Sequence, residues 1–331
     1  MQRTIIRLIL SISYLLVTNT SVFADSFPRD TTYTPYQAWK NIRRNYPDTK
    51  IVAPYLSPTV REDRNVVYTT LADTPYGKRE LHLDIFRPVK PGKYPALLMI
   101  HGGGWVSGNK SMEIPMAQRI ADSGFVTIPI EYRLAPEAVY PAAVHDIKAA
   151  IRWVKANADK YSIDTTRIAI EGNSAGGQLA TLVGMTNQVA RFEGNEGNTE
   201  HSSTVHAVID IDGVVDFLAP SSLNLVRTST TCDIVWLGGS FIQKPEIWKE
   251  ASPVFWVNEK SVPVSFIEST QPRFHSGRDE MIDMMNQNKV YTEVHTLPDT
   301  PHTFWLYDPW FNPTVNYVIE FLNKVFKPHN K

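Results

Sequence analysis

The 331-residue sequence predicts an α/β protein with a mostly parallel, doubly wound sheet that is flanked by helices. Three observations predict this class: short, wholly apolar runs, helical stretches between those runs, and a preceding segment in which polar and apolar residues alternate. Wholly apolar runs are typical of strands that are buried on both faces of a parallel sheet. Their alternation with helices implies right-handed crossovers, which place helices on both sides of one sheet.

The first predicted strands are antiparallel. Residues 65–71 and 80–86 alternate polar and apolar side chains, with Pro75-Tyr76-Gly77 as the turn between them. Helices are predicted at 111–124 and at 142–158, where the second carries apolar residues on one face at helical spacing. The buried strands are predicted at 96–100, 125–130, 167–170, 207–211, 264–267 and 290–295.

The composition is typical of a soluble globular protein, with 43% hydrophobic and 20% charged residues. The formal net charge of -1 argues against a nucleic acid partner. Cys232 is the only cysteine, so no disulfide forms within the chain. We expect Cys232 to pack as a small buried apolar residue, and a reactive thiol is the alternative. No HExxH pattern or Cys/His cluster occurs, so neither a metal nor another cofactor is expected.

The strongest chemical pattern is Gly172-Asn173-Ser174-Ala175-Gly176, which lies between the predicted strand at 167–170 and a helix. A G-x-S-x-G pattern in this context is typical of a sharp strand-to-helix turn that lifts a nucleophilic serine clear of the sheet. The N–H of Ala175 and the start of the helix would then stabilise a developing oxyanion. Ser174 is therefore the predicted nucleophile.

A second glycine-rich pattern, His101-Gly102-Gly103-Gly104-Trp105, follows the predicted strand at 96–100. Bare peptide N–H groups in such a loop supply the other half of an oxyanion hole, and Gly103 and Gly104 are the preferred donors. A phosphate-binding loop is the alternative, but it would require a Gly-Lys-Ser/Thr ending, which is missing here.

These two motifs, together with Glu131-Tyr132-Arg133-Leu134-Ala135-Pro136-Glu137, resemble the hormone-sensitive-lipase-like branch of the α/β-hydrolases. The third motif is similar to the YRLAPE motif of that branch, and all three occur in the family's order. The resemblance extends from about Arg79 to Leu322. It implies the α/β-hydrolase fold, esterase chemistry, and a scaffold segment at 131–137 that packs near the site.

His302 is the predicted base, because it lies in the loop after the final predicted strand, where the order Ser, acid, His places the histidine. The acid is expected after the strand at 264–267. The usual family position there is Ser269-Thr270-Gln271-Pro272, which contains no carboxylate. Asp279, the next carboxylate along, is the predicted acid, and Glu268 at the strand end is the alternative.

Trp105 and Trp305 are predicted to contact substrate, because aromatic faces stack on sugar rings. Arg273 would bind a uronate carboxylate, with a salt bridge to Asp279 as the alternative. The chain resembles secreted bacterial polysaccharide acetylesterases, pectin acetylesterases in particular. This resemblance implies removal of acetyl groups from pectin oligomers. A small-ester or lipid carboxylesterase and a noncatalytic carbohydrate-binding relative are the alternatives.

The sequence is predicted to comprise a signal peptide, an N-terminal segment and a catalytic domain. Residues 1–24 are predicted to be a signal peptide, with a positive start, an apolar stretch at 8–17 and a small-residue cleavage site. The apolar stretch is too short to span a bilayer, so a periplasmic chain without a stable membrane anchor is expected. Residues 25–64 are predicted to form an N-terminal arm or cap element, and 65–331 a catalytic domain with a lid-like insertion at about 216–260.

Overall fold

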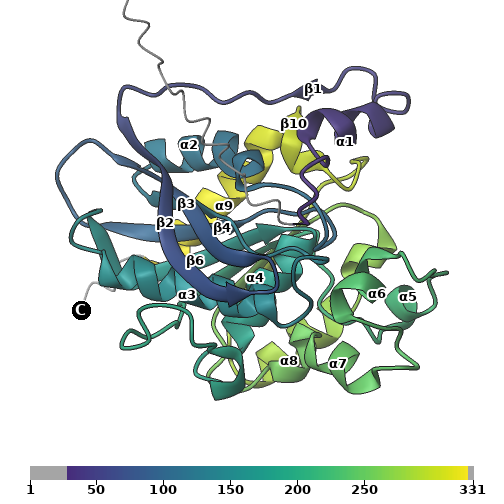
Figure 1. Ribbon diagram of the computed structural model, residues 1–331. Helices are drawn as coiled ribbons and strands as arrows, with labels where there is room; N and C mark the ends of the chain where they lie inside the picture. The colour runs from purple at the N-terminus through teal and green to yellow at the C-terminus, as the bar shows by residue number, and fades with distance from the viewer. Residues whose placement is uncertain (1–27, 327–331) are drawn as a thin grey trace, which may run out of the picture.

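The computed structural model describes residues 28–326, so the predicted signal peptide lies outside the described residues. An eight-stranded sheet forms the centre of the described part (Figure 1). Its strands are β2 (Val60–Thr74), β3 (Gly77–Pro88), β4 (Tyr94–Ile100), β5 (Val126–Ile130), β6 (Ile163–Asn173), β7 (Ala207–Ile211), β8 (Val264–Glu268) and β9 (Thr292–Thr296).

The strand order is β2-β3-β5-β4-β6-β7-β8-β9. The strands β2 and β3 are antiparallel to each other, and β3 is antiparallel to β5, whereas the pairs from β5 to β9 are all parallel. The mostly parallel, doubly wound sheet predicted from the sequence is therefore confirmed. Each predicted strand is present, with boundaries that differ by a few residues; the run at 167–170 is part of the longer β6.

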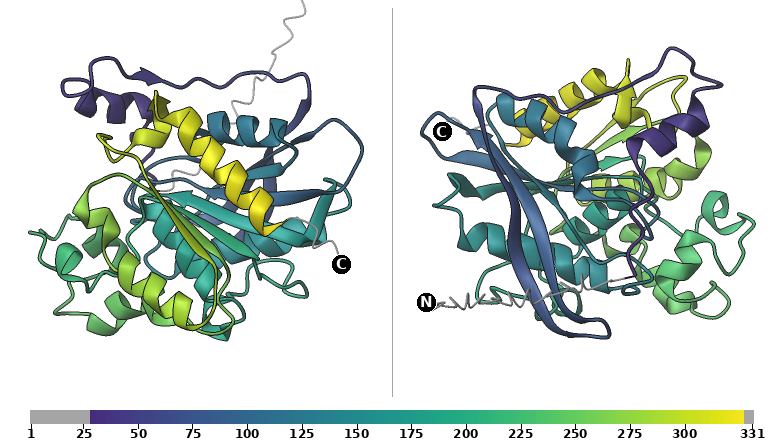
Figure 2. Two further views of the ribbon diagram at one scale, coloured as in Figure 1. Left: turned by 180° about the vertical axis from the view of Figure 1, so that it is seen from behind. Right: turned by 45° about the horizontal axis from the view of Figure 1, so that its top comes forward.

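Helices cover both faces of the sheet, as Figures 1 and 2 show. The helices α3 (Ala142–Ala156), α4 (Ala175–Met185) and α8 (Arg278–Gln287) contribute to one apolar core, and α2 (Ile114–Asp122) and α9 (Phe311–Val325) contribute to the other. Neighbouring residues of β4 enter opposite cores: Leu98 and Ile100 face one, Leu97 and Met99 the other. Burial on both faces explains why these strands lack polar alternation.

The segment from residue 28 to 64 runs along the side of the sheet that α2 and α9 cover (Figure 1). Its helix α1 (Pro35–Ile42) begins after Thr34, whose hydroxyl accepts a hydrogen bond from the N–H of Gln37. The short strand β1 (Lys50–Ile51) pairs with β10 (Tyr307–Asp308). The segment thus contacts the loop that carries His302, and its role as an arm or cap stays a prediction.

The region at 216–260 folds into the short helices α5 (Pro220–Leu223), α6 (Cys232–Leu237) and α7 (Pro245–Glu250), which lie together in Figure 1. Trp236 of α6 stacks on Trp105, with 4.7 Å between ring centroids. This region therefore packs against the HGGGW loop, and its action as a lid stays a prediction.

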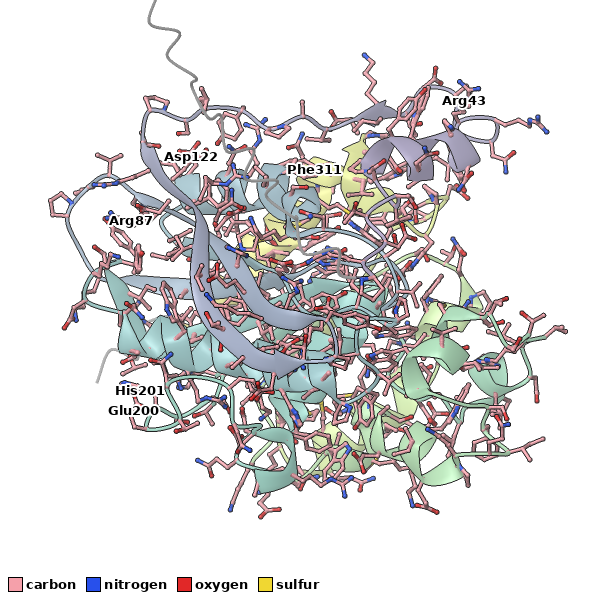
Figure 3. All side chains as sticks on the ribbon, in the orientation of Figure 1. Arg43, Arg87, Asp122, Glu200, His201 and Phe311 are labelled. Atoms are coloured by element: carbon pink, nitrogen blue, oxygen red, sulfur yellow. The ribbon has the colours of Figure 1, made fainter. Side chains whose placement is uncertain are left out.

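The glycine- and asparagine-rich stretch at 193–203 is a surface loop. Figure 3 labels Glu200 and His201 of this loop at the edge of the molecule, away from α5 and α6.

Within residues 28–326, none of the helices has the length and apolar character that crossing a membrane requires.

Candidate active site

Ser174 occupies the sharp turn between β6 and α4. Its backbone has φ 55° and ψ -119°, a conformation that residues other than glycine rarely adopt. A side chain on Gly172 would place its Cβ 2.1 Å from the carbonyl oxygen of Gly176, so the turn requires glycine there. The turn leaves the Ser174 hydroxyl at the carboxyl edge of the sheet, where it lines a pocket.

His302 lies between Ser174 and a buried carboxylate. The Nε2 of His302 is 2.8 Å from the Ser174 Oγ, and its Nδ1 is 2.8 Å from the Oδ2 of Asp212. The ring of Phe274 stacks on the imidazole with a centroid distance of 3.6 Å. The imidazole is therefore held by hydrogen bonds at both nitrogens and by an aromatic ring on one face.

Asp212 follows directly after β7 and is buried. Its Oδ1 accepts a hydrogen bond from the N–H of Ser269 at 2.7 Å, and its Oδ2 accepts one from the Ser269 hydroxyl at 2.7 Å. With the contact to His302, the carboxylate has partners at both oxygens, so its burial leaves no oxygen unsatisfied. The arrangement is that of a Ser-His-Asp triad.

The prediction of Asp279 as the acid is wrong, and so is the alternative, Glu268. The loop after β8 turns into α8, where the Asp279 side chain is 74% exposed and pairs with Arg278. Glu268 is buried and also forms an ion pair with Arg278. Both carboxylates are thus engaged elsewhere. The sequence did contain a signal for Asp212, because it follows the predicted strand at 207–211 immediately, at the same sheet edge as Ser174.

The predicted oxyanion donors lie around the same pocket. Gly104 and Ala175 line it together with Ser174, whereas Gly103 precedes Gly104 in the same turn without being part of the lining. Gly103 has φ 120°, and a Cβ there would lie 2.0 Å from the carbonyl oxygen of Ser107. Within the described residues, none of the backbone hydrogen bonds of turns and loops is donated by the N–H of Gly103, Gly104 or Ala175.

Asn173 connects the HGGGW loop to the nucleophile turn. Its Oδ1 accepts from the N–H of Gly102 at 3.1 Å, and its Nδ2 donates to the Oε2 of Glu113 at 3.0 Å. Burial raises the pKa of Glu113 to about 7, and burial together with the charge of Glu113 raises the pKa of Glu171 well above its ordinary value. Both carboxyl groups therefore release their protons at a higher pH than a glutamate in water does.

His101 and the YRLAPE-like motif support the same loop. Burial lowers the pKa of His101 to about 3, so its ring is neutral, and its Nδ1 is 2.7 Å from the carbonyl oxygen of Gly102. The Tyr132 hydroxyl donates to the carbonyl of His101 at 2.8 Å. The motif at 131–137 therefore packs against the oxyanion loop, which agrees with the scaffold role that the family resemblance implies.

The pocket at Ser174 has a volume of about 140 Å³. Trp105 forms part of its wall, and the indole Nε1 of Trp105 donates to the Oε1 of Gln178 at 2.9 Å. Arg273 also lines this pocket. Trp305 contacts His302 edge-on at 5.2 Å but lines a separate hollow of about 270 Å³. The structure therefore brings Trp105 and Arg273 to Ser174, and places Trp305 against the imidazole instead.

Solved structures with this architecture place the protein among the α/β-hydrolases. A structure described as a truncated form of a carbohydrate esterase from gut microbiota superposes with a TM-score of 0.70 and 26% identity, covering 82% of this chain and 100% of the other. A bifunctional GH43-CE protein from Bacteroides eggerthii matches with a TM-score of 0.67 and 25% identity, covering 80% of this chain and 38% of the other.

The chain belongs to the BD-FAE family, whose model matches residues 83–293. Among curated proteins, Esterase LipC of Mycobacterium tuberculosis is 30% identical over 263 residues, which are 74% of this chain and 62% of the relative. The probable carboxylic ester hydrolase LipM of the same organism is 31% identical over 72% of this chain and 57% of the relative. The chain thus spans less than two thirds of either relative.

Proposed function

We propose that this protein is a serine ester hydrolase in which Ser174, His302 and Asp212 form the catalytic triad. The observation that carries the proposal is the continuous hydrogen-bond chain from the Ser174 hydroxyl through His302 to the buried carboxylate. Membership of the BD-FAE family and the similarity to Esterase LipC support it.

The proposed mechanism assigns one role to each group. His302 Nε2 takes the proton of Ser174 as the Oγ attacks the ester carbonyl, and Asp212 accepts the hydrogen bond of Nδ1–H and stabilises the imidazolium. The N–H groups of the oxyanion loop and Ala175 stabilise the tetrahedral oxyanion, at about 3 kcal/mol per donor in comparable sites. His302 then gives the proton to the leaving alcohol, and water hydrolyses the acyl-enzyme.

We further propose an acetyl ester of a carbohydrate as the substrate. A pocket of about 140 Å³ is smaller than the roughly 300–1,000 Å³ of sites that enclose drug-sized ligands, so it favours a short acyl group over a lipid chain. The similarity to a structure described as a carbohydrate esterase supports a sugar as the alcohol. Pectin oligomers remain the specific proposal, and export to the periplasm, inferred from residues 1–24, would suit a polysaccharide substrate.

Of the two alternatives, only the noncatalytic relative loses support. The argument for a noncatalytic carbohydrate-binding relative was the missing acid, and Asp212 now supplies one. A general small-ester carboxylesterase would share the same catalytic groups, so only its preference among substrates separates it from a carbohydrate acetylesterase.

The test is acetate release from acetylated pectin, acetylated xylan and 4-nitrophenyl acetate. We compare the wild type with Ser174→Ala and with Ser123→Ala, which changes an exposed serine at the C-terminal end of α2. Preferential release from pectin that only Ser174→Ala abolishes would support the proposal. Activity on the small ester alone would remove the polysaccharide, and full activity of Ser174→Ala would overturn the mechanism.

A further inference from the structure

Arg273 lines the catalytic pocket. It belongs to the short turn η4 (Pro272–His275) and lines the same pocket as Ser174 and His302. Its guanidinium lies 5.8 Å from the ring of Phe274, which in turn stacks on the His302 imidazole. The turn that holds the imidazole therefore also sets the position of a positive charge beside the nucleophile.

This positive charge has no counter-ion within residues 28–326. The Nε of Arg273 is buried without a hydrogen-bond partner, and its guanidinium takes part in no ion pair. Arg273 is partly buried and arginine stays charged in proteins, so a partner would offset the hydration that its buried Nε has lost. Other shielded arginines have one: the pairs are Arg29–Glu131, Arg133–Asp146, Arg152–Glu193, Arg227–Asp233 and Arg278–Glu268.

The groups nearest to Arg273 do not neutralise it. Burial raises the pKa of the Cys232 thiol, so this neighbour is uncharged at neutral pH. Asp212 lines the pocket as well, but its oxygens are engaged by His302 and Ser269. Asp279, which was the alternative predicted partner of Arg273, pairs with Arg278 instead. The positive charge is therefore available to a molecule that enters the pocket.

We propose that Arg273 binds a carboxylate of the substrate, so that the preferred ester carries a negative charge close to the bond that is cleaved. This inference rests on the proposed ester hydrolase function and narrows its substrate class. A guanidinium presents its N–H groups as a planar fork that matches a carboxylate. The carboxylate belongs either to the alcohol half, as in a uronic acid sugar, or to the acyl half, as in a hemisuccinate.

The experiment uses matched pairs of substrates for the two sources. For the alcohol half, the O-acetyl ester of methyl galactoside is compared with that of methyl galacturonoside, since the two differ only in CH₂OH against carboxylate. For the acyl half, 4-nitrophenyl butyrate is compared with 4-nitrophenyl hemisuccinate. The enzymes are the wild type, Arg273→Gln, Arg273→Lys and Arg43→Gln, a control at the outer edge of the N-terminal segment (Figure 3).

We expect the wild type to prefer the charged member of one pair, the galacturonoside in the first instance. Arg273→Gln should raise KM for that member by about ten- to a hundredfold, the range of a hydrogen bond to a charged group, and change the neutral member less than about threefold. Arg273→Lys should retain part of the preference, because it keeps the charge and loses the fork. Added NaCl should weaken the preference.

Equal losses on the charged and neutral members in Arg273→Gln would overturn the inference, because they would assign Arg273 to the architecture of the pocket. A wild type without charge preference in either pair would overturn it as well. The proposed hydrolase function is tested separately, since neutral 4-nitrophenyl acetate must be cleaved by the wild type and not by Ser174→Ala. A failure there would reject the triad, whatever the charge preference.

Discussion

The carboxyl ends of β7 and β8 lie side by side in the sheet, where Ile211 is paired with Ile267. They contribute to one hydrogen-bond network in different ways. The end of β7 supplies the carboxylate of Asp212, and the residue after β8, Ser269, supplies a hydroxyl and an N–H that hold this carboxylate. The imidazole requires a carboxylate at one point in space, and two neighbouring strand ends reach this point.

The end of β8 also shows why a carboxylate nearby is not sufficient. Glu268 is buried one residue before Ser269, yet it forms an ion pair with Arg278 and accepts a hydrogen bond from the Thr296 hydroxyl at 2.9 Å. Successive side chains of a strand point to opposite faces, so a shift of one position turns a carboxylate away from the imidazole. The choice between the two strand ends therefore depends on direction as well as proximity.

The largest loss of kcat is expected from replacing Asp212, the carboxylate that follows β7. Asp212→Asn should lower kcat by about 10³- to 10⁴-fold, because an amide neither stabilises the imidazolium nor holds the productive tautomer. Asp279→Asn should stay within about twofold of the wild type, since Asp279 is exposed and paired with Arg278. Steady-state hydrolysis of 4-nitrophenyl acetate measures both. A large loss in Asp279→Asn with little in Asp212→Asn would reverse the assignment.

A smaller effect should follow from moving the acid between the two strand ends. Asp212→Gly removes the carboxylate, and glycine suits the positive φ of 54° at this position. Adding Ser269→Asp should then recover about ten- to a hundredfold in kcat. In the wild type the Ser269 hydroxyl lies 2.7 Å from the Asp212 Oδ2, the oxygen that contacts His302.

The control for this exchange is Asp212→Gly combined with Thr270→Asp, which adds the same charge at an exposed position one residue further along. Equal recovery in both double variants would mean that charge alone is sufficient. Recovery only with Asp at position 269 would show that the two strand ends are interchangeable sources of the acid.

The elements that the sequence predicted well are those fixed by local patterns. Wholly apolar runs gave the buried strands, and the Gly-x-Ser-x-Gly turn gave Ser174 because glycine is required where backbones approach closely. His302 was found because its loop follows the last strand. The acid was not found, because the choice among Asp212, Glu268 and Asp279 depends on which side chain reaches the imidazole in three dimensions.

Arg273 illustrates the same limit. From the sequence, a substrate carboxylate and a salt bridge to Asp279 were both open, since Asp279 lies only six positions away. In the structure Asp279 pairs with Arg278, and Arg273 faces the catalytic pocket. Which of two nearby arginines takes a carboxylate depends on how η4 and α8 are placed, and this placement leaves no pattern in the local sequence.

The smallest change in kcat is expected for Asp210, the carboxyl group within β7. Asp210 is buried and accepts hydrogen bonds from the Thr181 hydroxyl at 2.7 Å and from the N–H of Gly213 at 2.6 Å. Burial raises the pKa of this carboxyl from 3.8 to about 7. The folded state therefore binds a proton more tightly than the unfolded state, so this group stabilises the fold below about pH 4, and the contribution is lost as pH rises to about 7.

Asp210→Asn should remove this contribution to the pH dependence. Its urea midpoint should fall less between pH 5 and pH 8 than that of the wild type, and kcat should change less than about threefold. Asp279→Asn, at an exposed site, serves as the control and should follow the wild-type slope. An unchanged slope in Asp210→Asn would mean that Asp210 is ionised throughout. The expected result would mean that Asp210 is protonated below about pH 7, so that under these conditions the negative charge at this strand end lies on Asp212, beside the imidazole.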